Sequence, residues 1–228
     1  MAIILIQNAA VHNDASPGSL TIAPSNARSL IVVMIINSSG NTVSSVVDNS
    51  PGGSSLYVQV PNARSVSTVN GEACDIWYTA NSHQKATSIT IALSASGTND
   101  IFIFEVQNMN SSSPFQEIGV VNDGVAATTI VGASVTTSNA LDFIASVVNV
   151  SGGVSNITAG NAFTLGDIAN GNASAYLITK QKGTYNPAFD SSLSTFCSST
   201  ASFREAPHSI DVRGISNNRK TRPDYYEG

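Results

Sequence analysis

Residues 30–36, Leu-Ile-Val-Val-Met-Ile-Ile, are the most apolar stretch of the chain, and they decide its predicted fold. The run is rich in β-branched residues, and the turn sequence Asn37-Ser-Ser-Gly-Asn41 follows it at once. It fits a strand buried on both faces better than a helix, because its flanks show no helical period. We therefore expect it to be the central strand of a β-sandwich. Its core residues are expected to be one of two alternating sets: Val33 and Ile35, or Val32 and Met34.

Other runs with strand patterns fill most of the chain. The cleanest is residues 88–94, in which Ile89, Ile91 and Leu93 alternate with small or polar residues, as in a half-buried antiparallel strand. The run 101–106 is apolar on both faces apart from Glu105. The remaining predicted strands are 3–7, 19–23, 42–47, 56–60, 73–79, 128–137, 142–150, 173–180 and 193–204, with a possible short strand at 162–165; residues 61–71 are expected to form a polar loop.

The composition supports an all-β fold and excludes a helical one. Only 11% of the 228 residues are charged, against about 25% in average soluble domains, while Ser, Thr, Asn, Gly, Ala and Val dominate. The chain has no convincing internal repeat and no linker, so residues 1–206 are expected to form one domain. The predicted fold class is a two-sheet antiparallel β-sandwich of jelly-roll type, with residues 207–228 as an extended C-terminal arm.

A series of short strings resembles a known family. They are "NARSLIVVMI", "TVSSVVDNSPGGSSLYVQV", "CDIWYTAN", "TSITIALS", "IFIFEVQNMNSSSPFQ" and "ASVTTSNALDFIAS". Together they resemble a β-sandwich domain family of unassigned activity found in bacterial surface proteins and tailed-phage virion proteins. The resemblance covers about residues 3–203 and implies a sandwich, but its motifs are turns and core positions, so it implies no activity. The chain departs from the family at "EVQNM" and in the long 61–71 loop.

Charge and hydropathy limit the classes of partner that the protein is expected to bind and the compartment in which it is expected to work. The formal net charge is −5, and the basic residues do not cluster before the last twenty or so positions, so no nucleic-acid partner is expected. No apolar stretch approaches the ~20 residues that span a bilayer, so no membrane partner is expected either. The first eight residues lack the basic segment of a secretory signal. We expect a protein made in the host cytoplasm and located in the virion.

No catalytic, metal or cofactor site is predicted. The sequence lacks Gly-x-Ser-x-Gly, and its acids are scattered, so that Asp75 and Glu105 would be neighbours only by assumption. Asp48 and Asn49 beside glycines could bind calcium, but a hairpin turn uses the same residues and is the favoured reading. The three histidines have no metal-binding spacing and are expected at the surface in loops or the tail: His12, His83 and His208.

The sequence leaves open the state of two cysteines and the role of two aromatic residues. Cys74 and Cys197 are the only cysteines, and buried thiols are favoured over a disulfide. Trp77 and Tyr57 could stack on a sugar ring, although core or cross-strand packing is the commoner fate of such residues.

The expected function is that of a non-enzymatic structural protein of a tailed phage, first of all a capsid decoration or cement protein. Its expected partners are the major capsid protein or another virion protein, and further copies of itself. The alternative is a carbohydrate-binding or adhesin-type domain of a tail fibre or cell surface, with Trp77 or Tyr57 in the site. The arm residues expected to bind a partner are Ile210, Val212, Arg213, Ile215, Arg219, Lys220, Arg222, Tyr225 and Tyr226.

Overall fold

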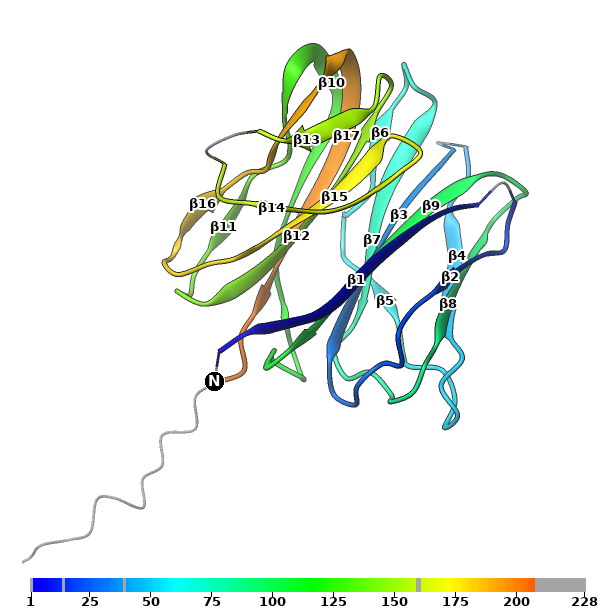
Figure 1. Ribbon diagram of the computed structural model, residues 1–228, viewed down its shortest axis with the longest axis vertical. Coiled ribbons are helices and arrows are strands. Elements are labelled where there is room, and N and C mark those ends of the chain that lie inside the picture. The colour runs from blue at the N-terminus through cyan, green and yellow to red at the C-terminus, as the bar shows by residue number, and fades with distance from the viewer. Residues whose placement is uncertain (1, 14, 39, 159–160, 208–228) are drawn as a thin grey trace, which may run out of the picture.

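The computed structural model describes residues 2–13, 15–38, 40–158 and 161–207, and strands are the only regular secondary structure in this part of the chain (Figure 1). It contains no helix long and apolar enough to cross a membrane. The strands are β1 (Ile4–Asn13), β2 (Gly18–Thr21), β3 (Leu30–Ser38), β4 (Val43–Asp48), β5 (Val58–Gln59), β6 (Ser65–Ser67), β7 (Glu72–Thr79), β8 (Ser88–Leu93), β9 (Asn99–Gln107), β10 (Phe115–Val131), β11 (Val135–Thr137), β12 (Asp142–Val150), β13 (Val154–Ile157), β14 (Thr164–Ala169), β15 (Asn172–Ile178), β16 (Gly183–Tyr185) and β17 (Ala188–Arg204).

Two main antiparallel sheets pack face to face. The first has the order β1-β9-β3-β7-β5, with β6 also paired to β7, and the second has the order β10-β17-β12-β15-β14, with β13 also paired to β17. The small sheet β2-β8-β4 covers the outer face of the first, while β11 and β16 lie at the opposite side of the molecule (Figure 1). The antiparallel β-sandwich predicted from the sequence is confirmed, whereas the jelly-roll connectivity stays a prediction.

Strand β3 is buried on both faces, as its continuous apolar sequence predicts. Every residue from Leu30 to Ile36 is at most 2% exposed. Val32 and Met34 pack into the core shared by the two main sheets, where Phe104 and Phe143 make an edge-to-face contact at 5.8 Å. Residues on the other face of β3, Ile31, Val33 and Ile35, pack against the small sheet. Both alternating sets are therefore core residues.

The second main sheet repeats the strand order of the first. In each half, the first strand pairs with the last, the last pairs with the central strand, and the central strand pairs with the next one out: β1-β9-β3-β7 and β10-β17-β12-β15. A β-bulge even recurs at the same place. It separates Leu5 from Gln7 opposite Val106 and Glu105 in the first half. In the second half it separates Phe115 from Glu117 opposite Phe203 and Ser202.

The side chain after each bulge also repeats its contact. Gln7 accepts a hydrogen bond from the Ala23 amide, just after β2, and Glu117 accepts one from the Thr136 amide in β11. Since bulges are placed features of a strand rather than defects, this shared detail indicates two copies of one topology. The two copies share one hydrophobic core, to which both main sheets contribute.

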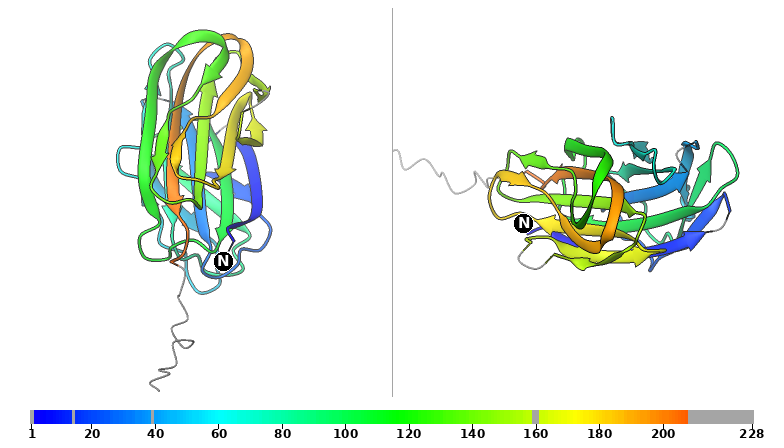
Figure 2. Two further views of the ribbon diagram at one scale, coloured as in Figure 1. Left: turned by 90° about the vertical axis from the view of Figure 1, so that its left-hand side faces the viewer. Right: turned by 90° about the horizontal axis from the view of Figure 1, so that it is seen from above.

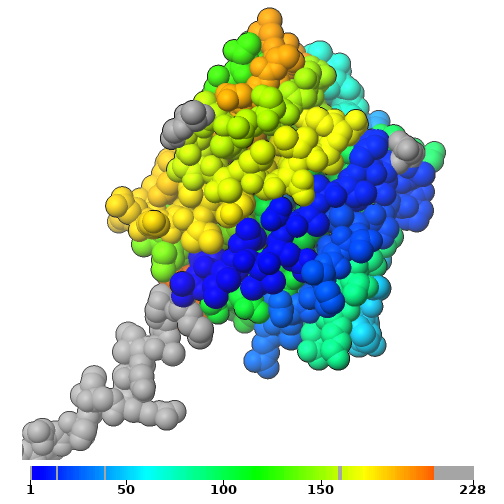
Figure 3. Space-filling model, viewed as in Figure 1, coloured from blue at the N-terminus to red at the C-terminus, as the bar shows by residue number. Residues whose placement is uncertain are grey.

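The edges of the two main sheets meet each other. On one side β1 runs along β14, and the Asn8 side-chain amide donates to the Gly166 carbonyl at 3.1 Å. Figure 3 shows this meeting of the dark-blue N-terminal strand and the yellow segment. On the other side β10 meets β6, where Asn122 accepts from the Val66 amide and Asp123 from the Thr68 amide. These contacts cover the exposed backbone groups that make sheet edges prone to aggregation. The flattened outline of the molecule is visible from the side and from above (Figure 2).

Several strand predictions differ from the structure in the second half. β10 begins at Phe115, thirteen residues before the predicted strand, and runs through three further register shifts between Val121 and Thr129. The turn-forming residues of that segment, including Asp123 with a positive φ of 44°, are absorbed as bulges instead of ending the strand. β6 lies inside the predicted 61–71 loop, and β16 lies in a segment predicted to separate strands.

Candidate functional site

The residues predicted to bind a partner through the arm lie outside the described part of the chain. They are Ile210, Val212, Arg213, Ile215, Arg219, Lys220, Arg222, Tyr225 and Tyr226. His208 also falls there.

The predicted sugar-stacking pair is not a surface platform. Tyr57 is only 7% exposed, and its hydroxyl donates to the Asp48 carboxylate at 3.2 Å, so its ring offers no face to a sugar. Trp77 is half-buried and packs against the core beneath the small sheet. Its position in β7, opposite Val33 of the apolar strand β3, explains this burial. Cross-strand and core packing is the fate of both rings.

A polar network lies at one end of the shared core and joins the two halves. The His12 Nδ1 atom is 2.5 Å from an Asp100 oxygen, and the Asn172 amide donates to the other Asp100 oxygen at 2.6 Å. The Asn149 amide then donates to the Asn172 oxygen at 3.0 Å and also to the Glu72 carboxylate. His12, Asp100 and Glu72 belong to the first half, and the two asparagines to the second. We call these five residues the seam network.

Strand alternation places the seam network at the end of the core. Asp100 lies two residues before Phe102, Glu72 two before Cys74, and Asn149 two after Val147, and each of these neighbours is a core residue. Since side chains alternate across a strand, each polar residue shares a face with its apolar neighbour. The polar groups therefore close the apolar interior on one side and pair with one another across the sheets.

Burial sets the ionisation of the two acids. Burial, together with the charge of Asp100, raises the pKa of Glu72, while His12 and the Asn149 hydrogen bond oppose this rise. Burial also raises the pKa of Asp100 against the opposing hydrogen bonds of Asn172 and His12. Both acids therefore hold a proton at higher pH than exposed acids do.

Three members of the seam network, Glu72, Asn149 and Asn172, line a polar pocket. The pocket has a volume of 530 Å³, and its lining includes the amides of Asn70, Asn149, Asn170 and Asn172. Asn70 links its walls: it donates to Asn149 at 2.9 Å and accepts from the Thr195 hydroxyl at 2.7 Å. Amide and carboxylate groups on a fixed frame are suited to hydrogen bonding with hydroxyl groups of a ligand. We call this the seam pocket.

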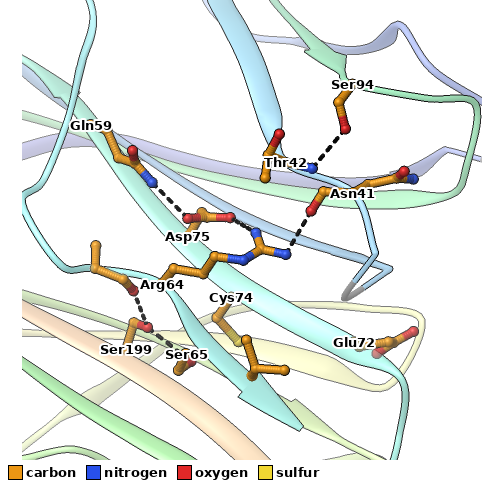
Figure 4. Close-up of polar contacts among 12 residues, drawn as sticks. Asn41, Thr42, Gln59, Arg64, Ser65, Glu72, Cys74, Asp75, Ser94 and Ser199 are labelled. Atoms are coloured by element: carbon orange, nitrogen blue, oxygen red, sulfur yellow. Dashed lines mark hydrogen bonds and ion pairs between the residues drawn. The ribbon is translucent and has the colours of Figure 1, made fainter. Parts of the chain in front are cut away.

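A buried ion pair braces the other face of β7. Arg64 donates to the Asp75 carboxylate at 2.5 Å and to the Asn41 carbonyl at 2.6 Å, and Gln59 donates to the second Asp75 oxygen at 2.9 Å (Figure 4). The Asp75 side chain is 1% exposed. Burial raises the pKa of Asp75, while Arg64 opposes that rise. Asp75 is separated from Glu105 by β3, so these two acids do not form a carboxylate pair.

The remaining predicted ligand residues have structural partners. Asp48 accepts hydrogen bonds from the backbone amides of Ser50 and Ser55, as expected of a carboxylate that stabilises a turn. His12 lies in β1 rather than in a loop, which corrects its prediction. Cys74 and Cys197 are buried free thiols with their sulfur atoms 3.7 Å apart. Among the residues that the structure describes, no group of three or more His, Cys, Asp or Glu side chains could hold a metal ion.

Sequence reasoning missed the seam network because its members are spread from residue 12 to residue 172. One signal was present: Ser-Asn-Ala occurs both at 25–27 and at 138–140, just before the central strands β3 and β12. Aligning the halves on this string would have placed Leu30 against Phe143 and indicated the repeat.

Comparison of the chain with known protein families, with curated proteins and with solved structures finds no match. The resemblance to the β-sandwich family of bacterial surface and tailed-phage proteins therefore stays a prediction.

Proposed function

We propose that the chain is a non-enzymatic structural protein of a tailed-phage virion, in the first place a capsid decoration or cement protein. The observation that carries this proposal is the seam network, in which Asp100 and Glu72 of the first half accept hydrogen bonds from the Asn172 and Asn149 amides of the second. Hydrogen bonds of this kind hold the two halves of the sandwich together as one rigid unit, which suits a protein that bears mechanical load. The edge contacts between β1 and β14 and between β6 and β10 add to this rigidity.

The proposed partners are the major capsid protein or another virion protein, and further copies of the chain. Residues 1–206 carry twelve acidic and six basic residues, while residues 207–228 carry four of the ten basic residues. The arm of one copy would thus be attracted to the acidic body of another, an attraction that salt screens. The proposed location is the virion, after synthesis in the host cytoplasm.

Particle binding tests the proposal. The full chain should co-purify with intact particles in a fixed ratio to the major capsid protein, and truncation after Ala206 should weaken that binding in a salt-dependent way. The isolated truncated domain should melt near the full chain, since its core lies within residues 3–203. Equal binding by the truncated chain would remove the arm from the proposal. Absence of the full chain from particles would remove the virion assignment.

A carbohydrate-binding or adhesin-type role is the second candidate, and the amide-lined seam pocket favours it. Asn170 lines the pocket with an exposed side chain and has a positive φ of 49°. Asn170→Gly removes its amide while suiting that backbone conformation. Binding to a glycan array that this variant loses would support the second candidate, and an array without signal would count against it.

A further inference from the structure

A second pocket lies at the end of the first half opposite the seam network. The loops that carry its lining residues are at the lower right of Figure 1. Three loops form it: β2–β3, β4–β5 and β7–β8. Its volume is 540 Å³. The lining residues used below are Arg28, Asn81, His83, Gln84 and Lys85.

This pocket gathers positive charge in an acidic protein. Arg28 and Lys85 are two of the six basic residues in residues 1–206, and His83 adds a group that gains charge on protonation. No Asp or Glu is among its lining residues in the described part of the chain. Neither the Arg28 nor the Lys85 side chain has a hydrogen-bond or ion-pair partner among the described residues, and both are exposed. Their charges are therefore available to a ligand.

The loops hold these cations on a fixed frame. The buried Ser82 hydroxyl donates to the Asn26 carbonyl at 2.7 Å and accepts from the Ser29 amide at 3.0 Å. The Arg28 amide donates to the Ser82 carbonyl at 2.9 Å, and the Lys85 amide donates to the Ser25 carbonyl at 2.7 Å. These bonds join the β2–β3 and β7–β8 loops directly, so little ordering is left for a ligand to impose.

The backbone at both cations is unusual. Arg28 has a φ of 62° and Lys85 a φ of 66°, a left-handed conformation that residues other than glycine, asparagine and aspartate seldom adopt. Such strain persists where surrounding contacts over-determine it, and it concentrates at ligand sites.

His83 is oriented by the third loop. Its Nδ1 atom lies 2.7 Å from the Gly53 carbonyl, and its amide donates to the Ser55 hydroxyl at 2.9 Å. A carbonyl oxygen only accepts, so Nδ1 carries the proton and Nε2 is the ring atom left to contact a ligand.

We propose that this pocket binds an acidic saccharide through its carboxylate. Arg28 presents a planar guanidinium that matches a carboxylate, and Lys85 adds a second cation. The Asn81 and Gln84 amides beside them can bind hydroxyl groups, and the volume suits a sugar unit better than a bare ion. The site is separate from the seam pocket and does not depend on the proposed virion role.

Isothermal titration of the full chain at low ionic strength tests this, with glucuronate, glucose and inorganic phosphate as probes. Glucuronate should bind more tightly than glucose or phosphate, and added sodium chloride should weaken its binding. The double variant Arg28→Ala, Lys85→Ala should lose about tenfold or more in affinity, because it removes two charge-assisted contacts. Nuclear magnetic resonance should map glucuronate-induced shifts to residues 81–85.

The repeat supplies a matched control. Lys180 is an exposed lysine in the β15–β16 loop, the counterpart of the β7–β8 loop in the second half. Lys180→Ala should leave glucuronate affinity unchanged, and urea unfolding should show that both variants fold as the parent does. The proposal is overturned by absent glucuronate binding, by binding that the double variant retains, or by phosphate binding as tight as glucuronate. A full chain that binds glucuronate but does not bind particles would count against the virion role alone.

Discussion

Replacing Arg64 with methionine would leave the Asp75 carboxylate buried without its cation. Arg64 is the charged partner of Asp75 at 2.5 Å, and the Asp75 side chain is 1% exposed. Methionine retains much of the apolar stem of arginine but none of its donors. Gln59 would remain as a neutral donor at 2.9 Å, which cannot balance a full charge.

The expected loss follows from this geometry. Removing one partner of a buried ion pair costs about 3–5 kcal/mol, because the other charge stays in a poorly solvating site. The parallel loss of the Arg64 bond to the Asn41 carbonyl acts in the same direction. For a chain of 228 residues, each kcal/mol shifts Tm by about 2–4 °C, so a fall of about 6–20 °C is expected.

The deficit should depend on pH. Burial already raises the pKa of Asp75, and Arg64 opposes the rise, so its removal raises that pKa further. An acid with a raised folded-state pKa contributes stability that is present below its unfolded pKa and lost as pH rises through its folded pKa. Arg64→Met should therefore lose less stability near pH 4 than at pH 7.

Urea unfolding of Arg64→Met at both pH values, with Tm from thermal melts, measures this. Arg28→Met is the matched control, since it makes the same change at an exposed arginine, and it should stay within about 0.5 kcal/mol of the parent. The double variant Arg64→Met, Asp75→Asn should recover part of the loss, because no unpaired charge remains. A loss below 1 kcal/mol in Arg64→Met at pH 7, or equal losses at both pH values, would refute the reasoning.

Three further predictions concern the core and the seam. Val33→Asp should cost several kcal/mol and leave little folded protein, because it places an unpaired charge at a fully buried site; a soluble variant with parental Tm would contradict this. Glu72→Gln should flatten the dependence of stability on pH above the ordinary glutamate pKa of about 4.3. Burial raises the pKa of Glu72, so the parent loses stability as pH rises through that raised pKa, while the variant has no acid to titrate; urea unfolding across pH 4–7 measures it. Native Cys74 and Cys197 should not react with a disulfide reagent at pH 8, and both should react after denaturation; fewer than two thiols under denaturing conditions would indicate a disulfide.

Much of the fold could be predicted from local sequence. Ile89, Ile91 and Leu93 alternate with less buried residues as their pattern indicates, and β3 is buried throughout because each of its side chains is apolar. The predicted strand 128–137 misses the start of β10. Asn122-Asp-Gly124 has the composition of a turn, and only pairing with β17 shows that the strand continues through it. The pocket lined by Arg28 and Lys85 could not be predicted for a similar reason, since these residues come to one pocket only when the β2–β3 and β7–β8 loops bond to each other.

The sequence by itself determined that the chain is all-β and which strand lies at its centre. These properties follow from hydrophobic periodicity and turn residues, which act over a few positions. Tertiary structure decided which polar residues are paired. Nothing near Asp100 in sequence predicts His12 and Asn172 as its partners, because strand order and register alone bring them within 2.5 and 2.6 Å. It also decided that two copies of one topology share a central core, because their strand order and first bulge agree although their sequences differ.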